Sequence, residues 1–236
     1  EKGGINFSDV TGENLPPTAL NNRPELTGAS FRAMGISIVF HPNNPHVPTS
    51  HANVRFFNAK TQNEKNIWWF GGGFDLTPYY PILEDVIFWH QQAKELCDSF
   101  KEGLYSEFKK NCDEYFYLSH RDETRGVGGI FFDDLILKDF STSLDFCKKV
   151  MQTFTKSYFN IFMKRKELSF GENEKKFQNY RRGRYVEFNL VHDRGTHFGL
   201  QSGGRTESIL MSMPPTANWI YDWVPQGDSK EEELYK

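Results

Sequence analysis

The chain has 236 residues, with 28 basic and 31 acidic side chains and a net charge of −3. This near balance disfavours a nucleic-acid partner, which would require a basic face, and hydrophobic residues at 38% are too many for a largely disordered chain. No apolar run approaches the ~20 residues of a membrane helix, so we expect no membrane span.

Three cysteines, Cys97, Cys112 and Cys147, form neither an even disulfide framework nor a CxxC pair for zinc. They predict buried thiols in a reducing compartment, and the lack of a charged-then-apolar leader favours a cytoplasmic protein. Because no repeat or linker is visible, we expect one domain over residues 1–236. Aromatic residues reach 16%, which suits a large core or a flat aromatic ligand.

The first half of the chain is predicted to contain strands followed by helices. The first thirty residues, with Pro16, Pro17 and Pro24, are expected to be irregular. Alternating apolar residues predict strands over 33–40, 53–57 and 67–76, the last interrupted by glycines 71–73. Apolar residues at helical spacing follow over 86–100 and again over 104–116, with a break at Gly103.

The second half returns to strands after a long helix. A buried strand is predicted over 130–137, and a long amphipathic helix over 144–161 with Ser141 or Ser143 as its N-cap. Alternation then predicts strands over 185–190 and 208–213. This order of elements predicts an α+β fold with a large, mainly antiparallel β-sheet flanked by α-helices.

Several familiar chemistries are excluded by their missing motifs. The sequence contains no GxxxxGK[ST], no GxGxxG after a strand, no GxSxG and no HExxH. Kinase, nicotinamide dehydrogenase, α/β-hydrolase and zincin functions are therefore disfavoured.

Polar side chains gather instead on a predicted strand and beside three glycines. His51, Asn53 and Arg55 alternate, so they share one face of the strand, for which a solvated outer face is the alternative explanation. Asp75 follows glycines 71–73, where missing side chains allow close approach to the backbone. A bulge with a capping aspartate would also explain this pattern.

Two further segments carry arginine in predicted turns. Asp193 and Arg194 follow one predicted strand, and Gly203, Gly204 and Arg205 precede another. Aspartate and glycine are common in turns for conformational reasons alone, but a turn has no need of arginine. The arginine in each of these segments is therefore not explained by the turn alone.

Four of the seven histidines are candidates for metal binding, with packing as the alternative. His90 lies on the apolar stripe of its helix, which is typical of a core histidine. His120 ends a helix, where an imidazolium interacts with the helix dipole. His41 and His51 flank a predicted turn that could bring them together. Four imidazoles would suit a borderline divalent metal.

Long motifs in this sequence resemble those of oxygen-dependent coproporphyrinogen III oxidases of the bacterial type. They are PTSHANVRF at 48–56, WWFGGGFDLTP at 68–78, RGVGGIFFDD at 125–134, YRRGRYVEFNL at 180–190, DRGT at 193–196 and GGRTESILMSMPP at 203–215. The resemblance covers essentially the whole chain, while an N-terminal helical stretch and a short C-terminal piece of the family pattern are absent. His192 and His197 depart from the pattern and are given no role in shared chemistry.

The resemblance implies an activity in haem biosynthesis. Such enzymes convert two propionates of coproporphyrinogen III to vinyl groups with O2, releasing CO2 and H2O2 and giving protoporphyrinogen IX. They are homodimers and require no organic cofactor, because the electron-rich pyrrole can itself reduce O2. A non-catalytic tetrapyrrole-binding or carrier protein remains an alternative, as does a metal-dependent oxygenase that uses the four histidines.

The resemblance also implies roles for individual residues. It assigns catalysis to His51 as a proton donor, to Asp75 and Asp193 as acceptors for the pyrrole N–H groups, and to Arg194. The implied substrate-binding residues are Ser37, Asn53, Val54, Arg55, Gly203, Gly204 and Arg205.

A metal site and a dimer interface are implied in the same way. The implied ligands of a divalent cation such as Mn2+ are His41, His51, His90 and His120. The implied dimer contacts are His120 and the strand region from Tyr185 to Ile220.

Overall fold

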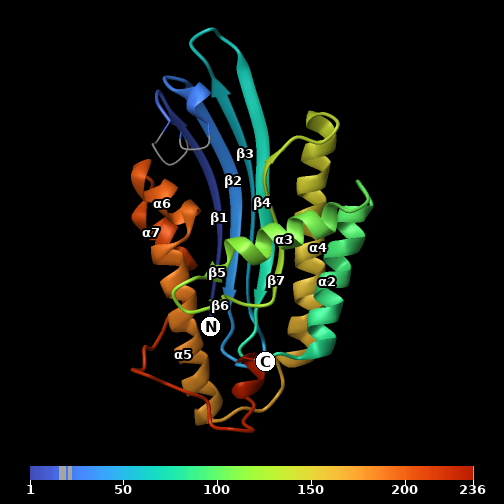
Figure 1. Cartoon of the computed structure of the whole chain (residues 1–236), viewed down its shortest axis with the longest axis vertical. Coiled ribbons are helices and arrows are strands. Elements are labelled where there is room, and N and C mark those ends of the chain that lie inside the picture. Colours follow the sequence, from blue (N-terminus) through green and yellow to red (C-terminus); the bar gives the residue numbers. More distant parts are fainter. Residues whose placement is uncertain (16–19, 21–22, 236) are drawn as a thin grey trace.

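The computed structural model describes residues 1–15, 20 and 23–235, so the predictions for Pro16 and Pro17 lie outside the described residues. Its centre is a five-stranded antiparallel sheet in the order β1-β2-β3-β4-β7 (Figure 1). The strands are β1 (Lys2–Gly12), β2 (Ser30–His41), β3 (Thr49–Lys60), β4 (Asn66–Thr77) and β7 (Gly128–Leu135). A two-stranded hairpin pairs β5 (Tyr117–Leu118) with β6 (Glu123–Thr124).

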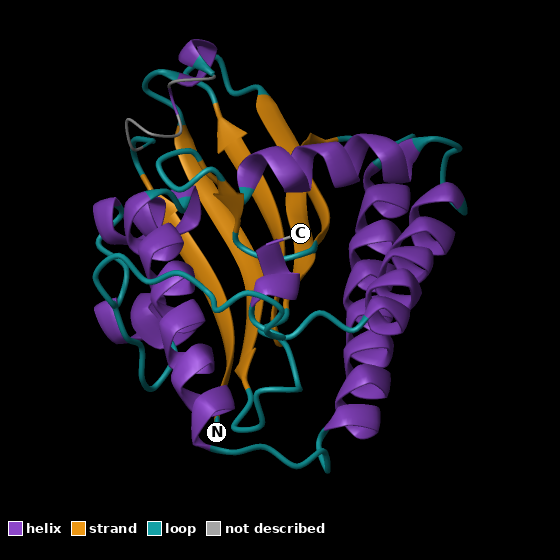
Figure 2. Ribbon diagram, turned by 60° about the horizontal axis from the view of Figure 1, so that its bottom comes forward, coloured by secondary structure: helices purple, strands orange, loops and turns teal. Residues whose placement is uncertain are grey.

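Helices lie on both sides of this sheet. They are α2 (Leu83–Asp98), α3 (Leu104–Tyr115), α4 (Phe140–Arg165), α5 (Glu172–Val191), α6 (Arg194–Gln201) and α7 (Thr206–Ile209), with short 3-10 turns at Pro24–Leu26, Leu210–Ser212 and Glu232–Tyr235. Figures 1 and 2 show α2 and α4 together on one side and α5 on the other. The α+β prediction with a mainly antiparallel sheet is confirmed.

The two faces of the sheet differ in chemistry because successive strand residues point to opposite faces. One face carries Phe40, Ala52, Phe70, Phe74 and Phe132, which join the main hydrophobic core with α2 and α4. The opposite face carries a smaller aromatic cluster at one end of the sheet. That cluster includes Phe31, Phe57 and Trp69, and Phe198 of α6 packs against it.

Several local predictions are confirmed. The break between α2 and α3 falls at Gly103, which has φ +80 and is the N-cap of α3. All three cysteines are free and buried. No helix in the described part of the chain is long and apolar enough to cross a membrane.

The predicted irregular N-terminus is wrong for residues 2–12. β1 pairs with β2 in register from Lys2 opposite His41 to Gly12 opposite Phe31. The prediction failed because β1 is an edge strand whose own apolar residues, such as Ile5, are exposed. Its conformation follows from pairing with β2 rather than from its own apolar pattern.

The two predicted C-terminal strands are also wrong. Residues 185–190 lie inside α5, residues 208–212 lie in α7 and the following 3-10 turn, and Met213 is the C-cap of that turn. The helical pattern was hidden because α5 buries three arginines among its apolar side chains. The region from Tyr185 to Ile220 therefore contributes helices and coil, not strands, to any dimer interface.

Two boundaries also differ from their predictions. The side chain of Asp139, rather than Ser141 or Ser143, caps α4 by accepting a bond from the Thr142 amide at 2.8 Å. The glycines 71–73 do not interrupt β4, which runs unbroken through them, although its pairing with β7 shifts register between Phe70 and Gly72.

Candidate active site

The predicted polar row occupies the sheet face opposite the main core. In the register of β2, β3 and β4, His51 lies opposite Asp75, and Arg55 lies between Gly35 and Gly71. Asn53, between them, is half-buried like His51 and Arg55. The side chains of this row are therefore half-buried, and the row is not a fully solvated outer face of the sheet.

Hydrogen bonds connect the middle of this row. Arg55 donates from Nη1 to Oδ1 of Asn53 at 3.3 Å, and Asn53 donates to the hydroxyl of Ser37 at 2.8 Å. Ser37, Asn53 and Arg55 thus form a continuous polar strip, which extends the predicted row from β3 onto β2. The side chain of Val54 points to the other face, where it packs against the main core.

Glycines provide the space for this strip. A Cβ at Gly71 would lie 2.7 Å from the guanidinium carbon of Arg55, so the glycine lets that side chain lie flat across the sheet. A Cβ at Gly73, where φ is +152, would lie 2.1 Å from the carbonyl oxygen of Ile130. The space beside these glycines is therefore used by Arg55 and by the neighbouring backbone.

Asp75 is held by an arginine that the sequence reasoning missed. Arg125 donates to both carboxylate oxygens of Asp75 at 2.7 Å, and to Oδ1 of Asn189 at 2.8 Å. Burial would raise the pKa of Asp75, but Arg125 and His51 outweigh it and the pKa is lowered. The guanidinium carbon of Arg125 lies within 5 Å of the ring centroids of Phe116, Tyr185 and Phe188. The available signal was an arginine placed directly before a glycine-rich strand, in RGVGG.

Asp75 also contacts the predicted proton donor. Its side chain is only 3% exposed, and its Oδ1 bonds to Nδ1 of His51 at 3.2 Å. Both carboxylate oxygens of Asp75 therefore have donors within the described chain, and the carboxylate fixes the orientation of the His51 ring, which is 29% exposed.

Asp193 lies at the junction of α5 and α6, where it is the N-cap of α6. Its carboxylate accepts from the hydroxyl of Tyr115 at 2.7 Å and from both the amide and the hydroxyl of Thr196 at 3.0 and 2.7 Å. Burial would raise the pKa of Asp193, but these bonds and the nearby His51 lower it. Asp193 is thus anionic and its oxygens are largely occupied.

A third acidic residue, Asp133, joins the two predicted arginines. Its carboxylate lies 2.8 Å from Nη2 of Arg55 and 3.8 Å from Nη2 of Arg194. The rings of Tyr115 and Phe131 stack at 4.3 Å, and both guanidinium groups lie over the Phe131 ring. The structure therefore brings Arg55 and Arg194 together although they are far apart in sequence.

Gly203, Gly204 and Arg205 form the connection between α6 and α7. Gly203 has φ +71, which favours glycine, and the amide of Gly204 donates to the carbonyl of Gly199 at 2.9 Å. The glycines are explained by this helix end. The side chain of Arg205 is exposed and forms no ion pair with the described residues, so it is available to an anionic ligand.

The four histidines have separate partners. His41 is buried between the carbonyl of Ser212 and the hydroxyl of Thr49, and burial lowers its pKa to about 4. The His90 ring contacts the carbonyl of Val127 and the hydroxyl of Tyr105. His90 is half-buried, and both nitrogens of its ring have partners within the described chain.

A metal site is not formed by these residues. His120 pairs with Glu187, and its other ring nitrogen lies 3.3 Å from His192. Among the described residues, no three His, Cys, Asp or Glu side chains are grouped so as to hold a metal ion. The predicted ligand set does not fit a metal in this chain, and we derive no chemical step from one.

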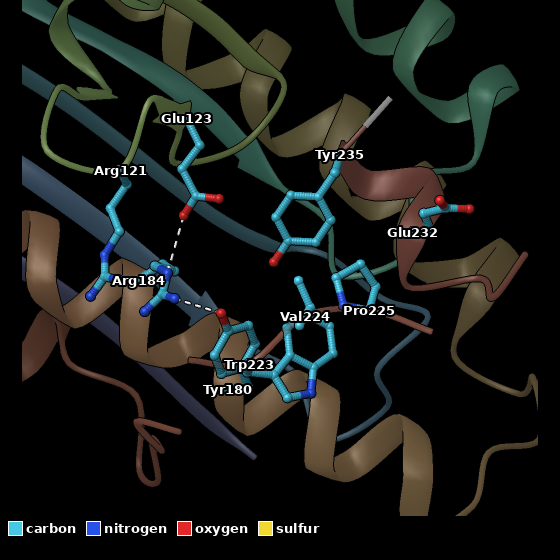
Figure 3. A pocket seen from close by; sticks show the side chains of 9 residues that line it. All are labelled: Arg121, Glu123, Tyr180, Arg184, Trp223, Val224, Pro225, Glu232 and Tyr235. Atoms are coloured by element: carbon cyan, nitrogen blue, oxygen red, sulfur yellow. Dashed lines mark hydrogen bonds and ion pairs between the residues drawn. The ribbon is translucent and has the colours of Figure 1, made fainter. Parts of the chain in front are cut away.

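A separate pocket of about 470 Å³ lies between α5, the β5–β6 hairpin and the C-terminal residues. Figure 3 shows Arg184 bonded there to Glu123 and to the hydroxyl of Tyr180. None of the residues predicted for catalysis or substrate binding lines this pocket. The candidate active site is therefore the polar face of the sheet with Arg194 and Asp193 beside it.

Comparison with known protein families gives one match over the whole chain. The sequence model of the family described as Coproporphyrinogen III oxidase matches residues 1–236.

Proposed function

Because the chain belongs to the coproporphyrinogen III oxidase family, we propose that it oxidatively decarboxylates two propionates of coproporphyrinogen III with O2. Each propionate, as R–CH2–CH2–COO−, reacts with O2 and a proton to give R–CH=CH2, CO2 and H2O2. The electron pair of one β C–H bond reduces O2, so the equation balances without an organic cofactor. Two such reactions give protoporphyrinogen IX.

The observation that carries this proposal is the polar row on a sheet face where Gly71 leaves room for the Arg55 side chain. Arg55 and Arg194 both lie beside the carboxylate of Asp133, one on β3 and the other at the start of α6. A substrate with several carboxylates needs more than one such cation, and guanidinium groups bind carboxylates through paired hydrogen bonds. The Phe131 ring, which is stacked on Tyr115, lies beneath both guanidinium groups and supports them from the sheet.

His51 is the best placed group for holding or moving a proton. Its Nδ1 is bonded to Asp75, and its Nε2 has no hydrogen bond within the described chain. The carboxylate, itself fixed by Arg125, selects the tautomer and the ring orientation. Nε2 of His51 is then free to give a proton to, or take one from, a bound substrate.

The proposal also includes the remaining substrate contacts, the cytoplasmic location and the homodimer. Asn53 and Ser37 orient a polar edge of the substrate beside Arg55, and Arg205 binds a further propionate. The protein is a cytoplasmic homodimer in which His120 and the region 185–220 form contacts between the subunits.

The test is turnover of reduced coproporphyrinogen III by the purified protein, without added cofactor, in air and under argon. We expect product in air, read as protoporphyrin fluorescence after chemical oxidation, and none under argon. Undiminished product in strictly anoxic buffer would contradict the oxygen-dependent reaction. A carrier protein would bind the substrate but consume no gas.

Chelation separates the proposed enzyme from a metal-dependent oxygenase. Because the histidines have other partners, we expect dialysis against EDTA to lower the rate less than tenfold, or by under about 1.4 kcal/mol of barrier. Complete loss of activity, with recovery on adding Mn2+, would instead support the metal-dependent oxygenase.

A further inference from the structure

Asp133 lies between the two guanidinium groups that the proposed substrate requires. It comes from β7, whereas Arg55 comes from β3 and Arg194 from α6. We propose that Asp133 competes with the substrate for these arginines: its carboxylate pairs with both of them and is displaced when a substrate propionate binds. This inference rests on the proposed function and adds a residue that sets its substrate specificity.

The contacts are those of an exchangeable pair rather than a buried structural one. The side chains of Asp133, Arg55 and Arg194 are 34%, 36% and 54% exposed. Such partly hydrated ion pairs contribute little net stability, so exchanging one carboxylate partner for another costs little. The buried pair of Arg125 and Asp75, each 3% exposed, has no such freedom.

Charge makes the competition effective. Burial would raise the pKa of Asp133, but Arg55 and Arg194 outweigh it and the pKa is lowered, so the side chain remains a carboxylate near neutral pH. It therefore reduces the net charge of the two-arginine group from +2 to +1. A ligand with a single carboxylate replaces one ion pair with another and gains little. A ligand that presents two suitably spaced carboxylates engages both arginines and outcompetes Asp133, which favours polycarboxylate substrates.

The adjacent Asp134 offers a matched control on the same strand. Its carboxylate pairs with Arg23 at 2.7 Å rather than with the two site arginines. Its backbone has φ +51, which asparagine also tolerates. Asp133→Asn and Asp134→Asn therefore change the total charge equally but only one of them alters the site.

The experiment measures the dissociation constant of coproporphyrin III, a stable tetracarboxylate, by fluorescence titration of the wild type and both variants. We expect Asp133→Asn to bind about fivefold more tightly than the wild type, and Asp134→Asn to match the wild type. We expect the difference to diminish in high salt, because salt screens partly exposed charges. Equal thermal unfolding midpoints would show that all three proteins are folded alike.

The outcomes separate this inference from the proposed function. Unchanged or weaker binding by Asp133→Asn would overturn the inference, because Asp133 would then serve to position Arg55. Tighter binding by this variant, together with no turnover of coproporphyrinogen by the wild type, would support the inference and contradict the proposed enzyme. A wild-type protein that binds no coproporphyrin would overturn both.

Discussion

Arginine side chains in this protein occupy two contrasting environments. A buried arginine supports the fold, whereas partly exposed arginines are available to a ligand. Arg125 is 3% exposed and is fixed by Asp75, Asn189 and three aromatic rings. Removing a partner from such a buried pair costs about 3–5 kcal/mol of stability, because a charge is left uncompensated. Arg55 and Arg194 are partly exposed and retain the ability to bind a ligand.

Tyr115 is a positioning residue that the sequence reasoning missed. Tyr115→Phe removes the hydroxyl that donates to Asp193 at 2.7 Å. Losing a hydrogen bond to the charged form raises the pKa of a carboxyl group. If turnover requires ionised Asp193, the acid limb of the kcat/KM profile moves to higher pH, and kcat falls about tenfold. The measurement is a pH–rate profile of both proteins.

The control is Tyr105→Phe, which removes a hydroxyl that contacts His90 at 3.0 Å. We expect its profile to keep the wild-type acid limb. A Tyr115→Phe protein with an unshifted limb and normal kcat would show that the bond to Asp193 does not matter for turnover.

At the scale of elements, charged and polar contacts decide where helices form and begin. Arg182 in α5 is only 1% exposed because it donates to the carbonyl of Pro42 at 2.9 Å and lies 3.1 Å from the carboxylate of Glu1. Arg181 reaches Glu123 at 3.0 Å from the same helix. These contacts let α5 bury charges that a sequence pattern would place in water.

The start of α4 offers a direct comparison between the predicted and the observed cap. Asp139→Ala removes the side chain that caps the helix, so we expect a loss of about 1 kcal/mol in the free energy of unfolding. Ser141→Ala, at an exposed position predicted as the cap, should leave this quantity unchanged. Urea denaturation of both variants measures the difference. Equal losses would mean that Asp139 is not the dominant cap.

At the scale of the whole molecule, the sheet has one face covered by the main hydrophobic core and an opposite face that carries buried polar groups. His41 lies at the end of β2, where its ring contacts the carbonyl of Ser212 and packs edge-on against the Tyr185 ring. It therefore ties the sheet to α5 and to the C-terminal segment. Burial favours its neutral form, and Arg182, Lys2 and Arg125 add to this effect.

This burial predicts a pH dependence of stability. The pKa of His41 is lowered from 6.5 to about 4, so between these values the unfolded chain binds a proton that the folded chain does not. The free energy of unfolding therefore falls as pH decreases from 6.5 to 4, by up to about 3 kcal/mol from this residue. His41→Gln should be less stable at pH 7 but should show a shallower decline. Urea denaturation at a series of pH values tests this, and parallel curves for both proteins would contradict it.

The sequence by itself determined those features that follow from local period and composition. The alternation along β3 predicted that His51, Asn53 and Arg55 share one face, because a strand repeats every two residues. The apolar spacing of α2 and α3 and the glycine between them predicted two helices. The long motifs identified the family, which the match over residues 1–236 confirms.

Only the tertiary structure decided the features that depend on partners distant in sequence. β1 is a strand because it pairs with β2, and α5 is a helix whose arginines are neutralised by distant carboxylates. Asp75 is occupied because Arg125 reaches it from 50 residues away, and Asp133 lies between two arginines from separate elements. Backbone pairing and ion pairing depend on proximity in space, which periodicity along the chain does not encode.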